Sequence, residues 1–157
     1  MVWTIECSTC SERSWASDIV DLLDNHTDAS GWFRCDRGHQ AYIQKSFDLQ
    51  EPGHRWEPFL RGAVRLAPPS DTYQPFVFLV SNKRDGAVTD VWFSYYKDLR
   101  EYGGRLKLGY GPGGAPVLGT TEVLKLVQRL VTLDLVPAEA VHALFVSSVN
   151  PLHTRFE

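Results

Sequence analysis

The residues best suited to chemistry in this 157-residue chain are its three cysteines, which all lie near its beginning. Cys7 and Cys10 are separated by two residues, and His39 follows Cys35 by four positions. A Cys-x2-Cys turn places two sulfur atoms on one side, about 2.3 Å from a shared ion. Three thiolates and one imidazole suit tetrahedral Zn²⁺. The sequence therefore predicts a Cys3His zinc site formed by Cys7, Cys10, Cys35 and His39.

Other interpretations of these residues stay open at the level of the sequence. Cys7 and Cys10 could form a redox pair, although such a motif opens a helix after a strand–helix lead-in and only six residues precede Cys7. The cysteines could also be ordinary buried residues, and His26 and Asp36 compete with His39 as the fourth ligand. If four protein ligands are present, no coordination position is left for water, and the zinc is structural.

Residues 1–49 resemble a zinc ribbon, in which a strand leads into a Cys-x2-Cys turn and a second turn leads into another strand. The second turn of a zinc ribbon usually reads Cys-x2-Cys followed by glycine. Here it reads Cys35-Asp-Arg-Gly38-His39, so His39 would replace the missing cysteine. The resemblance implies a zinc-ribbon-like N-terminal module with a helical insertion between its two turns.

Composition limits the classes of function. The net charge is −3, so no overall positive field attracts nucleic acid or an anionic membrane. Residues 1–50 carry 4 Lys and Arg against 8 Asp and Glu, and hydrophobic residues make up 43% of the chain, enough for a substantial core. The N-terminal residues lack the pattern of a signal peptide, and no apolar run reaches membrane-spanning length. Unpaired cysteines favour a reducing, cytoplasmic setting.

Hydrophobic spacing predicts the elements that position the cysteines. Trp15, Ile19 and Leu22 recur at helical spacing, so a helix is expected over 15–25 with Ser14 as its N-cap. The acidic side chains of this segment lie on the other face of that helix. We therefore expect an amphipathic helix between the two halves of the metal site.

The segment 51–54, Glu-Pro-Gly-His, is the clearest break in the chain. It divides the sequence into a zinc-ribbon-like module at 1–50 and an α+β domain at 51–157, which could also form one compact unit. The continuous apolar run at 75–80 predicts a strand that is buried on both faces. An Asp-Gly turn then predicts a returning strand over 88–96.

Two helices are expected at the C-terminal end of the sequence. The first runs from Thr120 or Thr121 to about Leu133, and the second begins at Pro137. The expected buried residues are Val123, Val127, Leu130 and Val131 in the first helix, and Val141, Leu144 and Phe145 in the second; Lys125, Gln128, Arg129 and Thr132 are expected to face water. Strands followed by helices predict an α+β fold with an antiparallel β-rich middle.

A second candidate site lies in residues 92–110, where tyrosines alternate with basic residues. Aromatic rings that stack bases beside cations that follow phosphates are what single-strand binding needs, and a protein-binding groove has a similar composition. Strands also favour aromatic residues, so half of these rings could be core. The candidate partner-binding residues are Tyr95, Tyr96, Lys97, Arg100, Arg105 and Lys107.

Residues 109–114 match the pattern G-x-G-x-x-G, with Gly111, Gly113 and Gly114 as candidate ligand-binding positions. Backbone amides in such a loop could hold a phosphate before a helix. Pro112 removes one amide, and neither a dinucleotide fold nor a Walker A lysine follows. A structural loop is the favoured interpretation.

No catalytic motif is present in the sequence, so function must be inferred from binding residues. The leading hypothesis is a non-catalytic, zinc-stabilised binding protein that engages a protein or a nucleic acid. One alternative is a small enzyme that acts on a phosphorylated or nucleic-acid substrate through residues 95–114. Another is a structural or assembly subunit, for which a homo-oligomer is one form.

Overall fold

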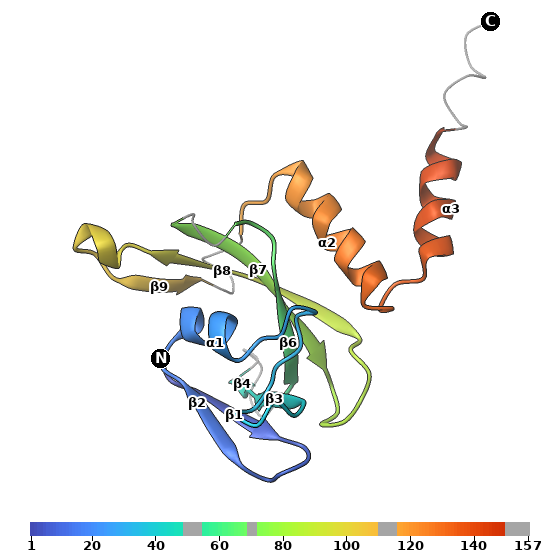
Figure 1. Ribbon diagram of the computed structural model, residues 1–157. Helices are drawn as coiled ribbons and strands as arrows, with labels where there is room; N and C mark the ends of the chain where they lie inside the picture. The colour runs from blue at the N-terminus through green and yellow to red at the C-terminus, as the bar shows by residue number, and fades with distance from the viewer. Residues whose placement is uncertain (49–54, 69–71, 110–115, 150–157) are drawn as a thin grey trace, which may run out of the picture.

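An antiparallel sheet forms the centre of the computed structural model, which describes residues 1–48, 55–68, 72–109 and 116–149. Its seven strands have the order β2-β1-β3-β6-β7-β8-β9 (Figure 1). Their bounds are Trp3–Cys7 (β1), Arg13–Ala16 (β2), Ala41–Gln44 (β3), Phe59–Arg65 (β6), Tyr73–Ser81 (β7), Asp90–Asp98 (β8) and Leu106–Gly109 (β9). The strands β4 (Phe47–Asp48) and β5 (Arg55–Trp56) form a separate pair. The expected α+β class, with an antiparallel β-rich middle, is confirmed.

The central strand β7 is buried on both faces, as its continuous apolar run predicts. Phe76, Phe78 and Val80 belong to one hydrophobic cluster, whereas Val77 and Leu79 belong to a second one. Successive side chains of a strand point to opposite faces, so the two clusters lie on the two sides of the sheet. Each side must therefore be covered by other elements.

Helices α1 (Ile19–Asn25) and α2 (Thr120–Thr132) lie over opposite faces of the sheet (Figure 1). α1 contributes Ile19, Leu22 and Leu23 to the cluster that contains Phe78. α2 contributes Leu126 to the cluster that contains Val77. The last helix, α3 (Ala138–Val149), extends away from the sheet beyond α2 (Figure 1).

The helix expected over 15–25 begins later than its hydrophobic spacing indicates. Ser14 and Ala16 are buried in β2, where Trp15 points outward and is 61% exposed. Asp18, rather than Ser14, caps α1, because its carboxylate accepts hydrogen bonds from the first-turn amides. Pairing of β2 with β1 thus overrides the helical spacing of Trp15.

The buried stripe expected for the C-terminal helices is also corrected. In α2 the buried residue is Leu126, whereas Val123 is 44% exposed. Arg129 faces water only in part, because its guanidinium donates to the carbonyl of Ala29 at 2.7 Å. In α3, Leu144 is 71% exposed instead of buried.

The main sheet contains strands from both sides of the break at 51–54, a segment outside the described residues. β3 pairs with β1 and also with β6, through Ile43 opposite Leu60. A further bridge joins Trp32 to Gly62. The N-terminal strands therefore continue directly into the sheet built by the later part of the chain.

At Gly62 the backbones of these two parts approach each other closely. A Cβ atom at Gly62 would lie 2.1 Å from the carbonyl oxygen of Gly31, which accepts a hydrogen bond from the amide of Ala63 at 2.8 Å. We expect Gly62→Ala to lower the free energy of unfolding by about 2 kcal/mol or more, because backbone must shift. Urea unfolding followed by tryptophan fluorescence measures this loss.

Gly103→Ala is the matched control for that substitution. Gly103, unlike Gly62, has a left-handed backbone, with φ +73°, but a Cβ there meets nothing within 4 Å. It should lose only about 1 kcal/mol, the cost of the left-handed conformation. Equal losses in the two variants would contradict the close approach of Gly62 to Gly31.

Candidate metal centre

Two tight turns bring the cysteine and histidine residues together. The first follows β1, where the amide of Cys7 donates to the carbonyl of Glu12 at 3.2 Å. In the second, the amide of Cys35 donates to the carbonyl of His39 at 3.0 Å, and Gly38 takes φ +78°. That positive φ favours glycine at this position. Because Cys7 pairs with Ala41 across β1 and β3, the second turn lies beside the first.

The candidate ligand atoms of Cys7, Cys10, Cys35 and His39 all lie within 4.8 Å of one another. The sulfur atoms of Cys10 and Cys35 are 3.9 Å apart. Cys7 and Cys35 are buried, and the other two residues are partly exposed. Three cysteines and one histidine at this separation could bind a metal ion.

An orphaned nitrogen atom supports this use of the cluster. Nδ1 of His39 is buried and has no hydrogen-bond partner among the described residues. A buried polar atom without a partner costs about 1–3 kcal/mol, so native structures rarely leave one. Coordination of a metal by the His39 ring would remove this cost, when the ring takes the tautomer in which its second nitrogen also has a partner.

The thiol of Cys7 lies in an environment that favours the thiolate, the form that binds metals. Burial acts to raise its pKa. Hydrogen bonds from the amides of Cys10 and Thr9, each 3.3 Å from the sulfur, and from the neighbouring thiols outweigh burial and lower the pKa to about 6. The backbone of the first turn is therefore arranged around a negatively charged sulfur.

Polar side chains join the two turns to each other. The sequence pattern does not predict these contacts. Glu12, after the first turn, forms an ion pair with Arg37 of the second turn. The hydroxyl of Ser14 accepts a hydrogen bond from the amide of Asp36 at 3.1 Å. These contacts join residues more than 20 positions apart in the chain, so local spacing could not indicate them.

The rival fourth ligands lie outside the cluster. Nδ1 of His26 is 3.6 Å from the carboxylate of Asp36, so these two side chains interact with each other. The group of four within 4.8 Å contains His39 instead. The geometry therefore favours His39 as the nitrogen ligand.

The redox interpretation of Cys7 and Cys10 receives no support from the local structure. The two residues lie at the end of β1 and in the turn that leads to β2, not at the beginning of a helix. All three cysteines are free thiols. Cys7 and Cys10 therefore lie at a turn between two strands, a position suited to metal ligands.

The candidate partner-binding residues of the 92–110 segment do not form one surface. Tyr95 and Tyr96 are successive residues of β8, so their rings point to opposite faces of the sheet. Tyr96 is only 3% exposed and packs beside Phe76. Tyr95 packs against Tyr73, with 5.2 Å between ring centroids, and Lys97 lies over that same ring. A surface role for Tyr96 does not fit this placement.

The basic residues of the segment also differ in their surroundings, because some are paired with carboxylates and others are exposed. Arg100 is held by the carboxylates of Asp98 at 2.6 Å and Asp18 at 3.0 Å, and Asp98 above all raises its pKa. Lys97 and Lys107 are exposed and opposite each other on β8 and β9, and Arg105 is exposed before β9. Gly111, Gly113 and Gly114 lie outside the described residues, so neither the structural nor the ligand-binding interpretation of this loop is tested.

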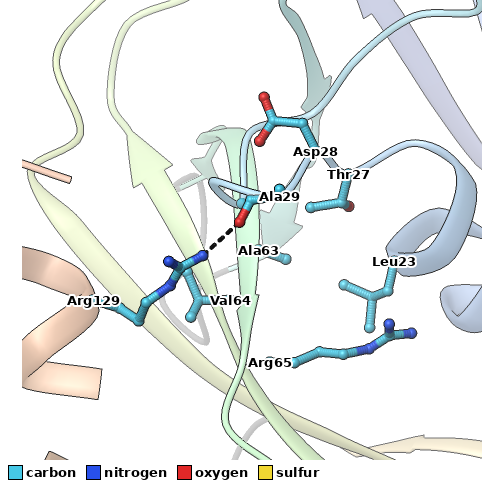
Figure 2. A pocket seen from close by; sticks show the side chains of 9 residues that line it. Leu23, Thr27, Asp28, Ala29, Ala63, Val64, Arg65 and Arg129 are labelled. Atoms are coloured by element: carbon cyan, nitrogen blue, oxygen red, sulfur yellow. Dashed lines mark hydrogen bonds between the residues drawn. The ribbon is translucent and has the colours of Figure 1, made fainter. Parts of the chain in front are cut away.

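Arg129 borders a hollow of about 180 Å³ between α2, β6 and the loop at 27–31 (Figure 2). Other charged groups of this hollow are already paired: Arg65 lies 2.5 Å from Asp24, and Asp28 lies 2.7 Å from Arg34. Figure 2 shows the Arg129 guanidinium turned toward the carbonyl of Ala29. We interpret this hollow as the contact that holds α2 against the loop, not as a ligand site.

No protein-family model, curated protein or solved structure matches this chain. Function must therefore be argued from the residues themselves. Within the described ranges, none of the helices has the length and apolar character needed to cross a membrane.

Proposed function

We propose that this chain is a non-catalytic binding protein, that a structural zinc ion stabilises its N-terminal part, and that its partner is a protein. The observation that supports the proposal is the group formed by Cys7, Cys10, Cys35 and His39. Soft thiolates with one imidazole in a tetrahedral arrangement favour Zn²⁺ over the hard cations Mg²⁺ and Ca²⁺. Four protein ligands leave no open position for water or substrate, so the ion would act in folding.

A protein partner fits the exposed surface better than a nucleic acid does. The chain has a net charge of −3, and the cation of Arg100 is already neutralised by two carboxylates. Nucleic-acid binding depends on basic groups that are free to replace counterions at phosphates. Apolar side chains such as Leu124 and Leu144 are exposed on α2 and α3, and exposed apolar patches mark protein-binding surfaces.

The metal content of protein purified without chelator tests the proposal. We expect about one zinc per chain, the value for a single Cys3His site. His39→Ala should lose most of this zinc during dialysis, because only three ligands remain. His26→Ala should retain it, because His26 contacts Asp36 instead of the cluster.

Two results would contradict this assignment. Wild-type protein with less than about 0.2 zinc per chain would remove the structural metal from the proposal. Loss of zinc from His26→Ala, with retention in His39→Ala, would transfer the fourth coordination position to His26.

A further inference from the structure

A mostly apolar groove of about 420 Å³ lies between α2 and α3. Its apolar lining comes from both helices: Leu124, Val127 and Val131 of α2, and Ala138 and Val141 of α3. Leu124 is 58% exposed at this groove. An exposed concave apolar surface of this kind is a candidate binding site.

Helix α2 carries two apolar stripes, whereas a helix that covers one sheet needs only one. The first stripe packs on the sheet and contains Leu126, Leu130 and Leu133. The second stripe lines the groove and contains Leu124, Val127 and Val131. At 100° per residue these two stripes lie on opposite sides of the helix. The second stripe therefore faces α3 and the groove rather than the sheet, and Leu124 remains exposed there.

Helix α3 is apolar on more than the side that faces the groove. Val141 lines the groove, while Leu144 and Val146 are 71% and 50% exposed. None of its described residues belongs to either hydrophobic cluster of the sheet. A helix that is apolar around most of its circumference is normally buried. α3 extends away from the sheet, in a position to reach another molecule (Figure 1).

We propose that the groove between α2 and α3 binds helix α3 of a second copy of this chain, forming a two-fold symmetric dimer. No further described helix lies in the groove, and α3 is an apolar helix whose Leu144 and Val146 are exposed. Two copies that exchange these surfaces cover both of them at once, and a two-fold axis closes the assembly. The proposal does not depend on the zinc site, which lies in a different part of the chain.

The charges beside the groove favour a contact in which α2 of one copy packs against α3 of the other copy. Lys125 directly follows the groove residue Leu124 on α2, and Glu139 directly follows the groove residue Ala138 on α3. Both side chains are exposed, and neither forms an ion pair with another described residue. Contact of α2 with the partner's α3 brings Lys125 near Glu139 of the partner subunit, and symmetry repeats the pair. Contact between two copies of α2 would instead bring like charges together.

Light scattering coupled to size exclusion, on the full zinc-loaded chain, tests the dimer. We expect a mass of twice 17.8 kDa. Leu124→Asp should weaken the dimer at least tenfold, or about 1.4 kcal/mol, because it places a charge in the groove. Val123→Asp is the matched control, because Val123 is exposed on the same turn but does not line the groove. It should remain a dimer.

A charge exchange tests the arrangement of the helices. Lys125→Glu and Glu139→Lys should each weaken the dimer, and the double variant should restore it. A wild-type monomer at all accessible concentrations, or equal effects of Leu124→Asp and Val123→Asp, would overturn the proposal. Failure of the double variant to restore the dimer would overturn the contact between α2 and α3. Zinc content, measured on each sample, reports separately on the metal site.

Discussion

Replacing Cys10 with serine is expected to abolish zinc binding at the proposed site. The free energy of unfolding should then fall by roughly 4 kcal/mol, when free zinc exceeds its dissociation constant about a thousandfold. The hydroxyl of serine is a poor ligand for zinc, and three protein ligands hold the ion much less firmly. Cys10 is the suitable position because it is only half-buried, whereas Cys7 and Cys35 are buried and their substitution would also disturb packing.

Thr9→Ala is the control for Cys10→Ser. Thr9 is exposed within the same turn, and its contact with the Cys7 sulfur is made by its backbone amide, which alanine keeps. This variant should bind zinc and unfold like the wild type. Thermal unfolding should be measured for all three proteins with and without a zinc chelator.

The chelator provides the decisive comparison, because it acts on the metal alone. It should lower the melting temperature of the wild type and of Thr9→Ala, and leave that of Cys10→Ser unchanged. If the chelator has no effect on the wild type, the four residues do not stabilise the fold through a metal. If it affects Cys10→Ser equally, the zinc is bound elsewhere.

The grouping of the three cysteines with His39 could be predicted from the sequence, because each half of the group depends on residues that are close together in the chain. Each half of the site is a short turn, and the spacing of Cys7 to Cys10 already fixes the direction of two sulfurs. The contact between the halves depends on the pairing of β1 with β3, which places Ala41 beside Cys7. That pairing, and the ion pair of Glu12 with Arg37, join distant parts of the chain and have no signature in residue spacing.

The beginning of α1 could not be predicted from the same kind of pattern. Trp15 lies four positions before Ile19, which fits a helix, but it also alternates with buried Ser14 and Ala16, which fits a strand. Local propensity alone does not decide between the two. The pairing of Trp15 with Thr4 in β1 decides it, and that contact is a tertiary one.

The candidate partner surface at 92–110 illustrates a different difficulty. Composition shows that tyrosines and cations are close in sequence, but a strand sends neighbours to opposite faces. Tyr96 therefore belongs to the core, and Tyr95 does not. In α2, similarly, the sequence contains two apolar stripes, and only the position of the sheet shows that Leu126, rather than Val123, is buried.

Phe78→Ala is expected to lower the free energy of unfolding by about 3–5 kcal/mol, the cost of emptying a fully buried aromatic site. Phe78 lies on β7 and is completely buried. Its ring contacts Trp3 and Phe33 from the N-terminal part of the chain at 5.7 and 6.4 Å between centroids, and Trp92 from β8 at 5.7 Å. The side chain thus joins residues on both sides of the break at 51–54.

Because Phe78 connects the two parts, its loss should also affect the metal site. Unfolding in urea should be followed twice, by tryptophan fluorescence and by zinc release to a coloured chelator. We expect both transitions to coincide in the wild type and to shift together in Phe78→Ala. Phe93→Ala, at an exposed position of β8, should cost about 1 kcal/mol or less.

Separate transitions would have a clear meaning. If zinc release occurs at its own urea concentration and Phe78→Ala leaves it unchanged, residues 1–50 fold around the metal independently, and the rest of the chain is a second unit. Coincident transitions mean that the metal stabilises the whole sheet, because the strands that hold Cys7 and those that pack on Phe78 unfold together. In that case a metal ion bound beside β1 and β3 also contributes to the stability of the surface that α2 forms over β6 and β7.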